Sequence, residues 1–165
     1  MTNLPLRDSN KASADVRGRI SPSAFMEVTE LAAIKVFCVK VLCPDPAQIG
    51  AVSQEAFPNL ESRLPKKDGE VDLKGRRMYG TYHEGEYRAC ATIKEGEDPN
   101  SLGLGTWEIP GGNYARVKID DWKNNTSKIG PAFDEMARKY KRDAARPLIE
   151  FYHRQSELIL LMPIA

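Results

Sequence analysis

Two stretches of the chain, Val39-Lys-Val-Leu-Cys43 and Tyr114-Ala-Arg-Val-Lys-Ile119, decide the fold. Each is an apolar, strand-like run that leads through a polar turn into an Ile-Gly pair, Ile49-Gly50 in the first case and Ile129-Gly130 in the second. An amphipathic run begins at each pair, and two further strand-like segments follow it. A unit of this kind cannot cover both faces of its own sheet, so two copies are expected to pack together.

The first copy is predicted to begin with a short edge strand and to contain a strand, a helix and a hairpin. Asp45 is a typical N-cap and Pro46 a typical first residue of a helix, whereas Pro58 is expected to kink or shorten that helix. The expected elements are an edge strand over 25–28, a strand over 33–42, a helix ending near residue 64, a loop over 66–75 and hairpin strands over 77–83 and 87–94.

The second copy repeats this order. Its helix has an apolar face formed by Ile129, Phe133, Met136 and Tyr140, which are spaced four, three and four residues apart. The expected elements are strands over 106–109 and 113–120, a helix over 128–142 and hairpin strands over 147–153 and 157–164. The fold class is therefore predicted to be α+β: an antiparallel sheet of two pseudo-symmetric strand-helix-hairpin units with two helices and a ligand cleft between the halves.

The predicted organisation is a disordered leader over residues 1–22 and one domain over 23–165, built from repeats 24–95 and 104–165. A formal net charge of +1 across 165 residues gives no global field for nucleic acid or anionic membrane. The longest apolar stretch, 31–43, contains Lys35 and Lys40 and is too short to span a bilayer. The first twenty residues lack an apolar signal-peptide region, so a cytoplasmic location is expected.

Motifs for metals, cofactors and nucleophilic catalysis are weak. His83, His153 and Cys90 lack the spacing of metal ligands, and Gly111-Gly112 fits a turn better than a phosphate-binding loop. No metal, cofactor or catalytic residue is therefore predicted. The three cysteines, Cys38, Cys43 and Cys90, lie in apolar sequence and are interpreted as buried free thiols.

Glu150 is the strongest candidate for chemistry, because it lies in the apolar strand Leu148-Ile-Glu-Phe-Tyr152. The period of two places Leu148, Glu150 and Tyr152 on one face. A carboxylate that is buried there must be paired, protonated or available to a cationic ligand with an aromatic body. The alternative is a glutamate at a sheet edge, or one that is paired with Arg116 or Lys118.

Aromatic residues concentrate in the predicted strands, where they are either core or the wall of a ligand cleft. Those in strand-like sequence are Phe37, Tyr79, Tyr82, Tyr87, Trp107, Tyr114, Phe151 and Tyr152.

Over residues 24–165 the chain resembles the GyrI-like small-molecule-binding domain, also called the AraC-type effector-binding domain. The resemblance is carried by the strand entry at 25–36, by Ile109-Pro-Gly-Gly-Asn-Tyr-Ala115, by Ile149-Glu-Phe-Tyr-His153 and by the closing segment 160–164. His153 departs from the aspartate that is common in the family. The chain is expected to be a stand-alone member without the DNA-binding domain of many relatives, similar to cassette-encoded drug-binding proteins. Transcriptional control would then need a separate DNA-binding partner.

The resemblance implies an aromatic cleft between the two units, with an acidic residue that contacts cationic or amphipathic ligands. That residue matches Glu150, Tyr152 lies two positions on, and Tyr82 is similar to the family's hairpin tyrosine. The predicted ligand site is completed by Trp107, Tyr114 and Phe37.

Sensing or sequestration of a cationic amphipathic molecule is the leading interpretation of this site. One alternative is a hydrolase of reactive electrophiles that uses Glu150 as base and Tyr82 as hydrogen-bond donor. Another is a protein-interaction module, which would need a large exposed apolar patch. Direct binding to nucleic acid or to a membrane is not expected.

Overall fold

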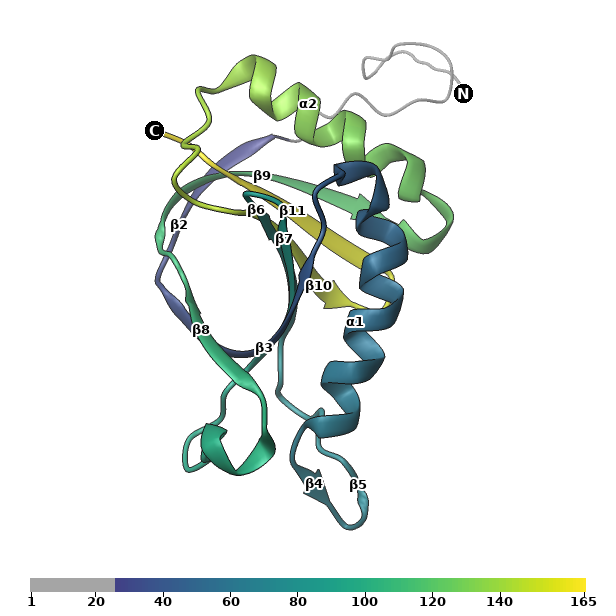
Figure 1. Cartoon of the computed structure of the whole chain (residues 1–165). Coiled ribbons are helices and arrows are strands. Elements are labelled where there is room, and N and C mark those ends of the chain that lie inside the picture. Colours follow the sequence, from purple (N-terminus) through teal and green to yellow (C-terminus); the bar gives the residue numbers. More distant parts are fainter. Residues whose placement is uncertain (1–25) are drawn as a thin grey trace.

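One antiparallel sheet of eight strands carries two α-helices in the computed structural model, which describes residues 26–165 (Figure 1). The prediction for residues 1–22 lies outside the described residues. The strand order in the sheet is β2-β9-β11-β10-β6-β7-β3-β8. The elements are β2 Glu27–Leu31, β3 Ile34–Leu42, α1 Ile49–Arg63, β6 Met78–His83, β7 Glu86–Thr92, β8 Gly105–Ile109, β9 Gly112–Asp120, α2 Ile129–Lys139, β10 Leu148–Arg154 and β11 Glu157–Pro163.

The two halves of the chain repeat the order strand, helix, hairpin, as the sequence predicted. They meet at the middle of the sheet, where β10 of the second half pairs with β6 of the first. The α+β fold class with two such units is confirmed.

A long ribbon joins the halves a second time. β2 and β3 pair with β9 and β8 in one continuous register, so that Leu31 faces Gly112 and Ile34 faces Ile109. Gly111 lies at the crossing between these pairs, where a Cβ atom would come within 2.7 Å of the Leu31 carbonyl oxygen. A side chain would not fit at this position. Because Gly111 has none, the strands can pass close together and the sheet can curl.

Local signals fix most of the element ends. The Asp45 carboxylate accepts a hydrogen bond from the Ala47 amide at 3.0 Å and caps the 3₁₀ turn Pro46–Gln48 that leads into α1. Pro58 does not end α1, which continues to Arg63. The hairpin β6–β7 turns through Glu84 and Gly85, both with positive φ, which is the backbone that a two-residue hairpin turn requires.

Several expected bounds differ from the structure. The edge strand expected over 25–28 is β2, Glu27–Leu31, and the hairpin strand expected over 87–94 ends at Thr92. Residues 66–75, expected to form a loop, contain the small ribbon β4 Lys66–Lys67 and β5 Glu70–Val71, which turns through Asp68 and Gly69. The second helix stops at Lys139 instead of Arg142, because Arg142 forms a β-bridge with Ile164. Tertiary pairing outcompetes the last helical turn at this point.

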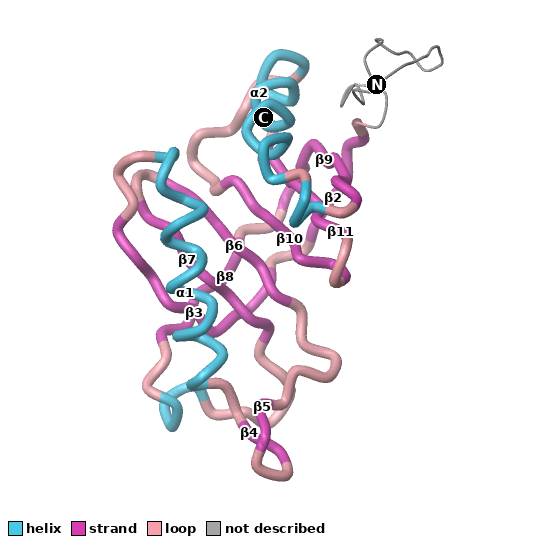
Figure 2. Tube along the Cα trace, turned by 90° about the vertical axis from the view of Figure 1, so that its right-hand side faces the viewer, coloured by secondary structure: helices cyan, strands magenta, loops and turns pink. Residues whose placement is uncertain are grey.

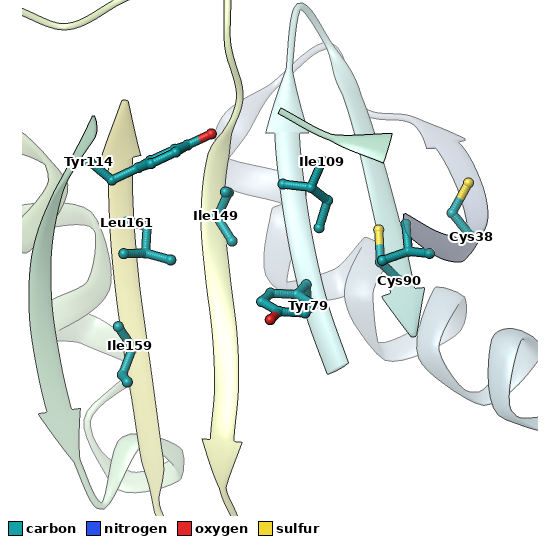
Figure 3. Close-up of a cluster of buried hydrophobic side chains, with 9 residues drawn as sticks. Cys38, Tyr79, Cys90, Ile109, Tyr114, Ile149, Ile159 and Leu161 are labelled. Carbon is teal, nitrogen blue, oxygen red and sulfur yellow. The ribbon is translucent and has the colours of Figure 1, made fainter. Parts of the chain in front are cut away.

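The sheet has apolar residues on both faces. α1 and α2 lie on one face, where α1 covers residues such as Phe37 and Ala89 and α2 covers residues such as Ala115 and Leu160 (Figure 2). The opposite face carries a separate core that includes Tyr79, Tyr114, Ile149 and Leu161 (Figure 3). We refer to these as the helix face and the far face.

The three cysteines are free and buried, as predicted. Within residues 26–165, none of the helices has the length and apolarity that a bilayer span needs.

Candidate functional site

Glu150 lies near the centre of the sheet on the helix face. Its strand, β10, lies between β6 and β11, and Glu150 faces Gly80 on one side and Leu160 on the other. The Tyr152 hydroxyl donates a hydrogen bond to Oε1 of Glu150 at 3.0 Å, which confirms that the two side chains share a face. Glu150 is partly buried.

Gly80 and Tyr87 lie next to Glu150 in this site. A Cβ atom on Gly80 would collide with the Tyr87 hydroxyl and would lie 3.0 Å from Oε1 of Glu150. The missing side chain therefore provides the space that the hydroxyl and the carboxylate occupy. The Tyr87 hydroxyl is buried beside this carboxylate but forms no hydrogen bond within the described residues.

Two rings, one from each half of the chain, pack on the Tyr152 ring. Phe57 of α1 and Trp122, which opens the 3₁₀ turn Trp122–Asn124 before α2, both meet the Tyr152 ring edge-on at 5.2 Å. The indole Nε1 of Trp122 is buried and, among residues 26–165, has no hydrogen-bond partner. We call Glu150, Tyr87, Tyr152, Phe57 and Trp122 the inter-helix site.

Among residues 26–165, no cationic side chain forms an ion pair with the carboxyl group of the inter-helix site. Neither alternative reading of Glu150 describes the structure, because β10 is an internal strand and the two candidate partners lie elsewhere. Arg116 bonds Glu27 at 3.0 Å, and Lys118 lies 3.8 Å from Asp120 and 3.9 Å from Glu157. No ion pair within the described part of the chain includes Glu150.

Burial raises the pKa of Glu150, while the hydroxyls of Tyr152 and Tyr87 act in the opposite direction. Burial also raises the pKa of both tyrosines, so they remain protonated and can donate hydrogen bonds. Within residues 26–165 the carboxylate form of Glu150 is therefore stabilised by the Tyr152 hydrogen bond and by the nearby Tyr87 hydroxyl, and a cation at this position would stabilise it further.

Two other predicted ligand residues, Tyr82 and Phe37, lie on the helix face but have other contacts. The Tyr82 hydroxyl donates to the Cys43 carbonyl at 2.8 Å, so its hydrogen is directed away from Glu150. Phe37 is fully buried in the core beneath α1. The pair proposed for hydrolysis, Glu150 and Tyr82, does not share a hydrogen bond, and the tyrosine bonded to Glu150 is Tyr152.

The remaining two predicted residues, Trp107 and Tyr114, lie on the far face. Tyr114 is buried against Ile149 and Leu161, and its hydroxyl donates to the Pro110 carbonyl at 2.6 Å (Figure 3). The Trp107 ring has the Arg88 guanidinium stacked on it at 4.3 Å. The sheet thus separates these two aromatics from the inter-helix site.

Sequence reasoning did not assign Gly80, Phe57, Trp122 or Tyr87 to the site. Alternation along β7 could have shown that Tyr87 and Arg88 point to opposite faces of the sheet. It could not have shown that Tyr87 lies beside Glu150. That neighbourhood depends on β6 lying between β7 and β10, which no local pattern encodes.

Neither a scan of family models nor a search of curated proteins finds a match to this chain. Solved structures do share its fold. An integron cassette protein from Vibrio cholerae is 17% identical with a TM-score of 0.59, and the match covers 86% of this chain and 96% of that one. SAV2435, solved with tetraphenylphosphonium bound, is 12% identical with a TM-score of 0.60 and coverages of 85% and 93%. The EcmrR C-terminal domain is 10% identical with a TM-score of 0.55 and coverages of 85% and 96%.

These likenesses establish the fold, and it is the fold that the sequence resemblance implied.

Proposed function

We propose that the protein binds an amphipathic, cationic small molecule between α1 and α2, with Glu150 as its counter-ion. The observation that supports this most strongly is a partly buried carboxyl group that is bonded to Tyr152, lies beside an aromatic cluster and has no cationic partner within residues 26–165. A buried charge of this kind is costly unless it is paired. A delocalised organic cation would pair the charge and bury its own rings against Tyr152, Phe57 and Trp122.

The polar atoms of the inter-helix site suit such a ligand. Tyr87 and Trp122 each have a buried donor with no partner in the described structure, and Glu150 supplies the charge. Because the rings of Phe57 and Trp122 contact Tyr152, a ligand would have to displace at least one of them. We therefore propose that α1 and the Trp122 turn separate when the ligand enters.

The comparisons support the class of ligand. SAV2435, which shares the fold, was solved with tetraphenylphosphonium, a lipophilic aromatic cation. We propose that binding of this kind serves sensing or sequestration here, and that a role in transcription would act through a separate DNA-binding partner.

The test compares three probes of similar shape: tetraphenylphosphonium, neutral triphenylphosphine oxide and anionic tetraphenylborate. The chain should bind the cation most tightly, and Glu150→Gln should weaken the cation by about 30-fold or more, which is the effect of truncating one partner of a buried charge pair. Glu108→Gln, at an exposed position on edge strand β8, is the matched control and should leave all three affinities unchanged. Calorimetric titration gives the affinities.

Acidification provides a second test of the same proposal. Since burial raises the pKa of Glu150, protonation of its carboxyl group should weaken tetraphenylphosphonium binding as the pH falls through that raised pKa. The Glu150→Gln variant should lose this pH dependence. Equal losses for the cation and the neutral probe in Glu150→Gln would refute the role of the carboxylate, and consumption of an excess of ligand would favour the hydrolase.

A further inference from the structure

A second site lies at the open edge of the sheet, where β3 extends beyond the end of β8. We propose that this hollow binds a flat organic anion, for which an aromatic carboxylate is the simplest case. It has a volume of about 470 Å³ and is separate from the inter-helix site. The residues that supply its chemistry are Lys40, Arg63, Arg88 and Trp107.

Positive charge is in excess around the hollow. Lys40 of β3, Arg63 of α1 and Arg88 of β7 all line it, although they come from three different elements. Within residues 26–165, the carboxylate that forms ion pairs with these cations is Glu86, which lies 3.2 Å from Arg88 and 3.6 Å from Lys40. One carboxylate against three cations leaves the hollow positive, in a chain whose formal net charge is only +1.

The contacts of the Arg88 guanidinium fix its orientation and leave donors for a planar anion. The guanidinium stacks on the Trp107 ring at 4.3 Å and bonds Glu86 through one nitrogen, and the Arg88 side chain is 16% exposed. A guanidinium has five N–H donors in a fixed plane that matches a carboxylate, so donors remain for a ligand. The indole adds a flat apolar surface beside this charge.

The backbone of β3 adds a further donor. β8 pairs with β3 only from Ile34 to Cys38. The Cys43 amide donates to the Gly85 carbonyl on the side of β3 that faces β7. Successive N–H groups of a strand point to alternate sides, so the Lys40 amide, three residues earlier, points to the opposite side. No strand pairs with Lys40 on that side within residues 26–165, which leaves its N–H directed at the hollow.

The experiment titrates 2-naphthoate, with 2-naphthamide as the neutral probe of the same shape and 2-naphthylmethylammonium as the cation. Binding is followed by ¹H–¹⁵N spectra, with the Lys40 and Gly105 amides and the Trp107 indole as reporters. The anion should bind more tightly than either analogue. Arg63→Gln should weaken it by about tenfold or more, since one charged hydrogen-bond donor is lost. Arg63 is exposed, and its hydrogen bond to the Gly103 carbonyl at 3.2 Å is exposed as well, so this change should leave the fold intact.

Arg138→Gln on α2 is the matched control, because Arg138 is an exposed arginine away from the hollow. It should leave naphthoate binding unchanged, and so should Glu150→Gln, whereas Arg63→Gln should not alter tetraphenylphosphonium binding. Naphthoate binding that is no tighter than naphthamide binding would overturn the proposal. The same conclusion would follow if Arg63→Gln and Arg138→Gln had equal effects, or if naphthoate shifted only resonances of the inter-helix site.

Discussion

At the scale of single residues, the inter-helix site depends on the missing side chain of Gly80 as much as on the carboxyl group of Glu150. Gly80 lies directly opposite Glu150 and leaves the space that the Tyr87 hydroxyl and the Glu150 carboxylate share. A carboxyl group placed on an internal strand destabilises the fold, and the site retains it through one tyrosine hydrogen bond. The binding role that we propose for Glu150 would account for this cost.

Gly80→Ala should destabilise the fold by about 1–3 kcal/mol, because the new methyl group meets a buried hydroxyl with little room to move. Gly130→Ala is the matched control. Gly130 lies in α2 with no atom near its missing Cβ, so the change should stabilise by about 0.4–1 kcal/mol. Urea unfolding gives both values, and equal effects of the two substitutions would contradict this account of Gly80.

At the scale of elements, the buried ion pair Arg76–Glu97 links the segment before β6 to the segment after β7. Arg76 bonds Glu97 through two nitrogens at 2.9 and 2.7 Å and also donates to the Thr92 carbonyl at 2.7 Å. The Arg76 side chain is fully buried. Its Nε donates to the Asp72 carbonyl at 3.0 Å, so three residues bind the guanidinium, but only Glu97 carries a charge that compensates it. Removal of this carboxylate would leave an uncompensated charge.

Glu97→Gln should therefore destabilise the chain by about 3 kcal/mol at neutral pH. The Arg76 guanidinium lowers the pKa of Glu97, so its contribution is complete above the ordinary glutamate pKa and is lost as the pH falls through the lowered value. The difference in unfolding free energy between the natural chain and the Glu97→Gln variant should thus disappear on acidification. Thermal unfolding across pH measures it, with the exposed neighbour Glu95→Gln as control; a gap that is constant with pH would refute the argument.

At the scale of the whole molecule, the two units share one sheet. They are joined at its centre by β6 and β10 and again by the ribbon of β2–β3 with β8–β9. The inter-helix site takes Phe57 and Tyr87 from the first half and Trp122, Glu150 and Tyr152 from the second. Neither half could form this site without the other.

Unfolding should accordingly be a single cooperative transition. Far-ultraviolet circular dichroism and tryptophan fluorescence should give the same midpoint in urea, and residues 24–95 expressed alone should show no cooperative transition. Separate midpoints for the two signals, or a folded isolated repeat, would show that the halves are independent.

The sequence by itself determined the main strands, the two helices and the fold class, because these follow from local periodicity, helix caps and turn residues, whereas the β4–β5 ribbon and the end of α2 did not follow from it. Alternation along Leu148-Ile-Glu-Phe-Tyr152 was also enough to place Glu150 and Tyr152 on one face. Only the tertiary structure decided what surrounds them. Strand pairing joins residues far apart in the chain, so it brought Gly80 and Tyr87 beside Glu150 and left Trp107 and Tyr114 on the far face.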